Sequence, residues 1–201
     1  MPSFSVLNSI AKELQAQIVE ALNTAPDVDF DVDDKSIILL RPASDLPAEV
    51  MASLYLYHVD VDPHLRNRRR IPDAVDPVQM VRPPLPLQLR FLFVPVMTDE
   101  AKNQMMLGRV LQHFHDVPTF RPLPGSELDV SRGGAPEEIR VRHDFIPVQE
   151  LANLWSGLSY AMRLSAGLMV EIVTLDSGAP SVVIPRVDEV FGVTSKLDEG
   201  V

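Results

Sequence analysis

The chain of 201 residues contains no cysteine. Disulfide bonds and thiolate metal sites are therefore excluded, and the composition fits a reducing compartment. No uninterrupted apolar run approaches the roughly 20 residues that a membrane-spanning helix requires, so we expect no insertion into a membrane. Residues 1–22 also lack the basic start and following apolar run of a signal peptide, and we do not expect one.

Positive charge is scarce as well. The sequence has 18 Lys and Arg against 28 Asp and Glu, which gives a formal net charge of −10 at pH 7. A chain this acidic is not expected to bind nucleic acid, because the phosphate backbone repels it. Hydrophobic residues make up 46% of the chain, and a chain of this length can bury roughly 70% of its unfolded surface. We therefore expect an ordinary globular core.

Apolar residues at helical spacing predict three helices, over residues 5–23, 98–116 and 148–158. Thr98 is the expected N-cap of the second helix. Alternating or continuous apolar residues predict strands over residues 36–42, 51–61, 85–96, 137–147, 167–177 and 181–187. Both faces of the segment 51–61 are largely apolar, so we expect this strand to be covered on both sides.

Proline is abundant, and five of the 18 prolines fall within residues 62–84. We expect no regular element in this segment, because proline removes a backbone donor and fixes the backbone. A loop this long in a compact domain is usually functional or disordered. The order of the elements predicts an α+β fold: a single domain with a mixed or mostly antiparallel sheet covered by helices, and a long proline-rich loop at 62–84.

The proline-rich loop carries the densest positive charge of the acidic chain, at Arg66, Arg68, Arg69 and Arg70. The guanidinium group suits fork-like contacts with carboxylates. We therefore favour a protein partner with acidic residues over plain solvation, and nucleic acid is the weaker alternative.

The sequence contains fragments of catalytic and metal-binding motifs, but none of these motifs is complete. The segment "GLSYA", residues 157–161, resembles a serine nucleophile elbow around Ser159, but a helix precedes it and its last residue is not glycine. The acidic run 27–34 lacks the glycine and glutamate of a calcium loop. His113 and His115 lie two apart on a predicted helix and point to different faces. We expect no catalytic residue, no bound cofactor and no metal site.

Four segments, in this order along the chain, resemble a known protein family in their residues and not only in their apolar spacing. They are "LYLYHVDVDPHLRN" (54–67), "PPLPLQLRFLFVPV" (83–96), "LGRVLQHFHDVPTF" (107–120), and "ELANLWSGL" with "RLSAGLMVEIV" (150–173). Over residues 5–175 the chain resembles the cap, or tail-terminator, family of phage-tail-like contractile injection systems, of the anti-feeding prophage type. The chain departs from the family pattern at Phe91–Phe93 and at Ala166–Leu168. Longer relatives also carry a further C-terminal region.

The resemblance implies a structural protein and not an enzyme. It implies a ring, usually of six copies, that ends the inner tube and engages the last sheath ring, so the expected partners are tube protein, sheath protein and further copies of the chain. It also implies a terminator-like domain over 1–175, a short and partly flexible extension over 176–201, and cytoplasmic assembly on a particle whose release stays open. An adaptor at the baseplate or neck and a small serine hydrolase remain as alternatives.

Overall fold

The structure is a computed structural model, and it describes residues 5–26, 28, 30, 32, 38–44, 46–47, 49–65, 69–72, 79–121, 138–175, 177 and 179–183. The chain divides into two compact units. The large unit comprises Met1–Arg68 and Pro84–Asp176, and the small unit comprises Arg69–Pro83 and Ser177–Val201. The predicted α+β class is confirmed, since helices and a mostly antiparallel sheet make up the large unit.

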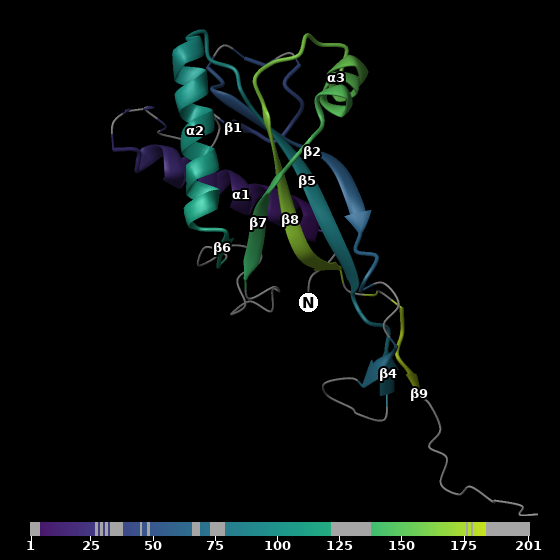
Figure 1. The fold of residues 1–201 in the computed structure, drawn as a ribbon. Helices are drawn as coiled ribbons and strands as arrows, with labels where there is room; N and C mark the ends of the chain where they lie inside the picture. Colours follow the sequence, from purple (N-terminus) through teal and green to yellow (C-terminus); the bar gives the residue numbers. More distant parts are fainter. Residues whose placement is uncertain are drawn as a thin grey trace, which may run out of the picture. The chain divides into compact units, whose positions relative to one another are not determined.

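A six-stranded sheet forms the centre of the large unit, in the order β1-β2-β5-β8-β7-β6 (Figure 1). The strands are β1 (Ile38–Leu39), β2 (Ala52–Val61), β5 (Leu85–Pro95), β6 (Thr119–Phe120), β7 (Ile139–Asp144) and β8 (Ala166–Leu175). Every pair is antiparallel except β1 with β2. The two edge strands are short, which limits the exposed backbone that could pair with other chains.

Helices α1 (Val6–Asn23) and α2 (Glu100–Asp116) cover one face of the sheet. Leu89, Phe91 and Phe93 alternate along β5, point to this face and are fully buried in one core with both helices. Residues that face this core recur every two positions in the strand and every 3.6 positions in the helices, so the sequence shows the apolar pattern of each element. The three predicted helices are confirmed.

Helix α3 (Val148–Gly157) lies on the other face, near one end of the sheet (Figure 1). Its Trp155 packs in a second, smaller core with Ala43, Leu92 and Val94. The second half of β5 is therefore buried on both faces, and its residues are apolar without alternation.

The prediction that strand β2 is covered on both sides holds for only part of its length. Ala52, Ser53 and Leu54 are buried, whereas His58, which pairs with Arg90 on the face of α3, is exposed. The reason is that α3 covers one end of the sheet, and the far end of this face has no helix among the described residues. A register shift between Leu56 and His58 marks the change.

The N-cap of α2 is Asp99 and not the predicted Thr98. The Asp99 carboxylate accepts hydrogen bonds from the backbone N–H groups of Ala101 (2.9 Å) and Lys102 (3.4 Å). A carboxylate at this position also interacts favourably with the helix dipole. Buried Asn103 then ties the helix to the end of β5, because it exchanges two hydrogen bonds with the backbone of Met97.

The small unit contains a three-stranded antiparallel sheet, in the order β3-β4-β9. Its strands are β3 (Ile71–Pro72), β4 (Gln79–Val81) and β9 (Val182–Val183). The expectation that residues 62–84 hold no regular element is therefore wrong. Pro72 is tolerated because β3 is an edge strand. The division into a domain over 1–175 and an extension over 176–201 stays a prediction, and residues 184–201 lie outside the described part.

Candidate interaction surfaces

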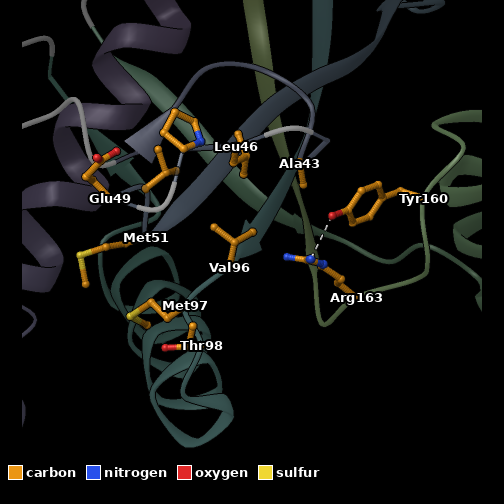
Figure 2. A pocket seen from close by; sticks show the side chains of 11 residues that line it. Ala43, Leu46, Glu49, Met51, Val96, Met97, Thr98, Tyr160 and Arg163 are labelled. Atoms are coloured by element: carbon orange, nitrogen blue, oxygen red, sulfur yellow. Dashed lines mark hydrogen bonds between the residues drawn. The ribbon is translucent and has the colours of Figure 1, made fainter.

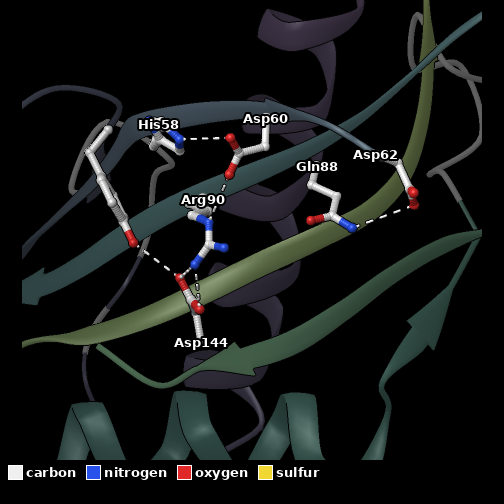
Figure 3. Close-up of polar contacts among 7 residues, drawn as sticks. His58, Asp60, Asp62, Gln88, Arg90 and Asp144 are labelled. Carbon is white, nitrogen blue, oxygen red and sulfur yellow. Dashed lines mark hydrogen bonds and ion pairs between the residues drawn. The ribbon is translucent and has the colours of Figure 1, made fainter. Parts of the chain in front are cut away.

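The sheet face opposite α1 and α2 carries a network of charged side chains where α3 does not cover it (Figure 3). Arg90 on β5 is its centre. The Arg90 Nη1 donates to both carboxylate oxygens of Asp144 at 2.9 and 3.0 Å, and Nε lies 3.4 Å from Asp60 Oδ2. The Tyr57 hydroxyl donates to Asp144 at 3.0 Å, and His58 Nε2 lies 2.9 Å from Asp60.

Gly167 lets the strands approach closely at this network. It pairs with Asp144 on one side and with Leu92 on the other. A Cβ atom at position 167 would lie 2.6 Å from the backbone oxygen of Asp144 and 3.0 Å from its Cβ. Because glycine has no side chain, β7 can lie against β8 where Arg90 reaches across to Asp144.

The network shifts the pKa values of two of its members, Tyr57 and Arg90. Burial, together with the charge and hydrogen bond of Asp144, raises the pKa of Tyr57 to about 12. Burial acts to lower the pKa of Arg90, but the charge and hydrogen bonds of Asp144 outweigh it, so this pKa lies above its ordinary value. Near neutral pH, Tyr57 is therefore a neutral donor and Arg90 a cation, and both hold Asp144, whose side chain is only 8% exposed.

Two further arginines stand beside this network on β7. Arg142 Nε lies 3.1 Å and Arg140 Nε 3.7 Å from the carboxylate of Glu171 on β8. The Glu171 side chain is 13% exposed, whereas both arginine side chains are more than half exposed. Two cations that share one carboxylate leave a local excess of positive charge on an acidic protein. The alternation of Ile139, Arg140, Val141 and Arg142 is the sequence signal for this surface, and this charge pattern was missed.

Of the predicted arginine cluster, the structure describes Arg69 and Arg70. Both are exposed at the start of the small unit, and neither forms an ion pair with another described residue. Arg66 and Arg68 lie outside the described residues, so the cluster of four stays a prediction.

A shallow groove at the end of β5 is a third surface feature (Figure 2). Arg163 lies over it, with its Cζ 4.9 Å from the ring centre of Tyr160 and its Nη2 3.2 Å from the Tyr160 hydroxyl. Val96 and Met97 line the groove together with Arg163. The lining is partly apolar, and among the described residues no cluster of acids, bases or nucleophiles converges there.

Ser159 does not occupy a nucleophile elbow. It has a φ of 55°, and it follows the end of α3 directly. Its N–H donates to Ser156 O at 3.0 Å, and the N–H of Tyr160 donates to Trp155 O at 3.2 Å. This pair of bonds is the Schellman motif, which explains the left-handed backbone as a helix ending. Within the described part of the chain, no three His, Asp or Glu residues are grouped to hold a metal ion.

No helix among the described residues has the length and apolarity to cross a membrane. The chain is similar in fold to two solved structures. One is the sheath/tube terminator, in the extended state, of the extracellular contractile injection system PVC, with 17% identity and a TM-score of 0.59 over 98% of this chain. The other is the cap that terminates the tube of the anti-feeding prophage, with 16% identity and a TM-score of 0.53 over 96% of this chain.

The chain spans 66% and 62% of the lengths of those two structures. No curated protein matches its sequence. The family model of the Pvc16 N-terminal domain matches residues 5–189. These findings confirm the resemblance to the cap and terminator family that residues 5–175 predicted. The chain belongs to the Pvc16 N-terminal domain family.

Proposed function

We propose that this protein is the structural cap, or tail terminator, of a contractile injection system. It ends the inner tube and engages the last ring of the sheath. The observation that carries this proposal is the family match over residues 5–189, together with the fold likeness to two terminators over nearly the whole chain. The similar structures are named for a structural role, which supports a function without catalysis.

The cap is a closed ring, and six copies is the expected number. Its partners are the tube protein, the sheath protein and neighbouring copies. Arg66, Arg68, Arg69 and Arg70 contact acidic groups on these partners. A single exposed ion pair contributes only about 0.2–1 kcal/mol, but a ring repeats each contact, so weak pairs together hold the cap. Assembly takes place in the cytoplasm on the particle.

Electron microscopy of particles from a strain that lacks the gene tests the proposal. A polymer without its terminator keeps growing or loses its sheath, so we expect tubes or sheaths of irregular length, and complementation restores a uniform length. Length-uniform, contractile particles in the deletion strain would refute the terminator function. Particles that lack a baseplate or neck would instead support the adaptor function.

A further inference from the structure

Strand β2 forms most of one margin of the large sheet (Figure 1). Its neighbour β1 pairs only with Ala52 and Ser53. Because β1 is so short, it exposes little backbone of its own, but it leaves the rest of β2 without a second neighbouring strand among the described residues. The other side of β2 pairs with β5 as far as Val61. The stretch 54–61 is therefore an edge of the sheet, and we call it the β2 edge.

The hydrogen bonds between β2 and β5 show which backbone groups point outward from the β2 edge. The N–H of Asp62 donates to Pro86 O at 3.0 Å, and bonded and unbonded pairs alternate along an antiparallel ladder. The pairs that contain Val61 and Val59 are then of the unbonded kind, so the N–H and C=O groups of both valines point away from β5. No described residue outside the sheet forms a backbone hydrogen bond with either valine.

The side chains along the β2 edge define the kind of segment that fits it. Val59 and Val61 pair with buried core residues of β5, so they point to the face of α1 and α2, yet they are 41% and 42% exposed. On the other face, the side chains of His58 and Asp60 are 52% and 42% exposed and contact each other. An added strand with apolar side chains beside the valines and polar ones on the other face would continue the core and bond the outward backbone groups.

We propose that an extended segment of a partner protein in the particle adds to the large sheet as a strand on the β2 edge. The segment has apolar side chains at every second position and polar side chains between them. In this mode of recognition, main-chain hydrogen bonds hold the peptide and the alternate side chains select it. The inference rests on the proposed function for its setting, and it adds the place and the chemistry by which the cap holds a partner.

A second copy of the chain does not match this edge. Two β2 edges that pair with each other are related by a two-fold axis, which turns the two copies in opposite directions. In a ring that ends a tube, all copies face the same way, so that pairing is excluded. At the opposite margin of the sheet, β6 and Pro118 bond β7 as far as Val141. The described part of β7 then offers a neighbour only His143, which is too short for a strand pair.

Proline at position 59 tests the edge. The Val59 N–H points away from β5, so Val59→Pro removes a donor for the added strand and takes no hydrogen bond from the pairing of β2 with β5. The variant should melt within a few degrees of the wild type, and its occupancy on particles should fall by about tenfold or more. Val59→Ile keeps the N–H and an apolar branched side chain, and this matched control should occupy particles like the wild type. Normal occupancy of Val59→Pro would overturn the proposal.

Amide hydrogen exchange tests the edge without any substitution. In isotope-labelled isolated protein, NMR should show fast exchange at Val59 and Val61 and slow exchange at Asp60, whose N–H points to β5. The labelled protein is then bound to particles of the deletion strain, exchanged, and dissolved for NMR. Exchange at both valines should be slower by about a hundredfold or more. Fast exchange on particles overturns the proposal. Slow exchange in the isolated monomer also overturns it, because the chain itself would then cover the edge.

Sedimentation velocity distinguishes a partner protein from a second copy. Any association of the isolated wild type should be unchanged in Val59→Pro. Association that this variant abolishes would assign the β2 edge to a second copy and overturn the proposal. The deletion experiment tests the proposed function separately. Particles of uniform length there would refute the cap, but they would not alter the exchange at the β2 edge on particles that bind the protein.

Discussion

The two units of the chain differ in how they use apolar residues. In the large unit, β5 is buried on both faces over its second half, by α1 and α2 on one side and by α3 on the other. In the small unit, no described residue is buried, and Ile71, Val182 and Val183 are exposed. Burial of apolar side chains therefore stabilises the large unit, while the side chains of the small unit are available for contacts.

The largest expected effect comes from the core of the large unit. Phe91→Ala removes a fully buried side chain between the sheet and the helices, so the free energy of unfolding should fall by about 3–5 kcal/mol. Val183→Ala in the small unit should change it by less than about 0.5 kcal/mol. Urea denaturation measures both. Similar decreases of the unfolding free energy in the two variants would contradict the conclusion that the large unit carries the stability.

Within the large unit, alanine substitutions at two glycines should change the free energy of unfolding in opposite directions. Gly167→Ala forces a Cβ against the backbone of β7, and the free energy of unfolding should fall by about 1–3 kcal/mol. Gly108 on α2 has no atom within 4 Å of an added Cβ, so Gly108→Ala should raise stability by about 0.5–1 kcal/mol. In thermal denaturation, the melting temperature should fall for Gly167→Ala and rise for Gly108→Ala. An unchanged melting temperature of Gly167→Ala would contradict the close packing of β7 against β8.

The open face of the sheet should contribute less. Tyr57→Phe removes the hydrogen bond to Asp144 and should cost about 0.5–1.5 kcal/mol near neutral pH. The pKa of Tyr57 is about 12 in the folded state and 10.0 ordinarily, so its contribution is complete below pH 10 and is lost as pH rises from 10 toward 12. Urea denaturation at about pH 8 and about pH 11 should give a smaller difference between the two proteins at the higher pH. An equal difference in unfolding free energy at both pH values would contradict the link between the Tyr57 hydrogen bond and the ionisation of Tyr57.

The smallest effect on stability should come from the arginine cluster. Alanine at Arg66, Arg68, Arg69 and Arg70 should change the unfolding free energy by less than about 0.5 kcal/mol. Cap occupancy on particles should nevertheless fall, and fall further at higher salt, because salt screens the remaining charge pairs. Arg121→Ala, at a side chain that is 81% exposed elsewhere, is the control. Normal occupancy across a salt series would mean that the cluster is only solvated.

The sequence predicted most of the large unit, because its signals are local. The helices and the long strands follow from apolar spacing within each segment, and only details such as the cap at Asp99 differ. The predicted strand at 181–187 contains β9, but β3 and β4 were missed because the prolines of 62–84 suggested a loop, and the pairing of β9 with β4 was missed because the two lie far apart in the sequence. The Arg90 network was missed for a similar reason. Its members lie on β2, β5 and β7, and their proximity depends on strand order and on Gly167, which no local pattern specifies.

The pairing of β4 with β9 has a consequence for the order of folding. Ser181 hydrogen-bonds to Gln79, which lies 102 residues away along the chain, so direct closure would cost much conformational entropy. Leu85 pairs with Leu175 at the ends of β5 and β8. Once that pair has formed, only the short segments 82–84 and 176–181 separate it from β4 and β9, so the loop that remains to be closed is short. The small sheet is therefore completed late, after the central strands have joined, and a growing chain has no finished small sheet until synthesis has passed β9.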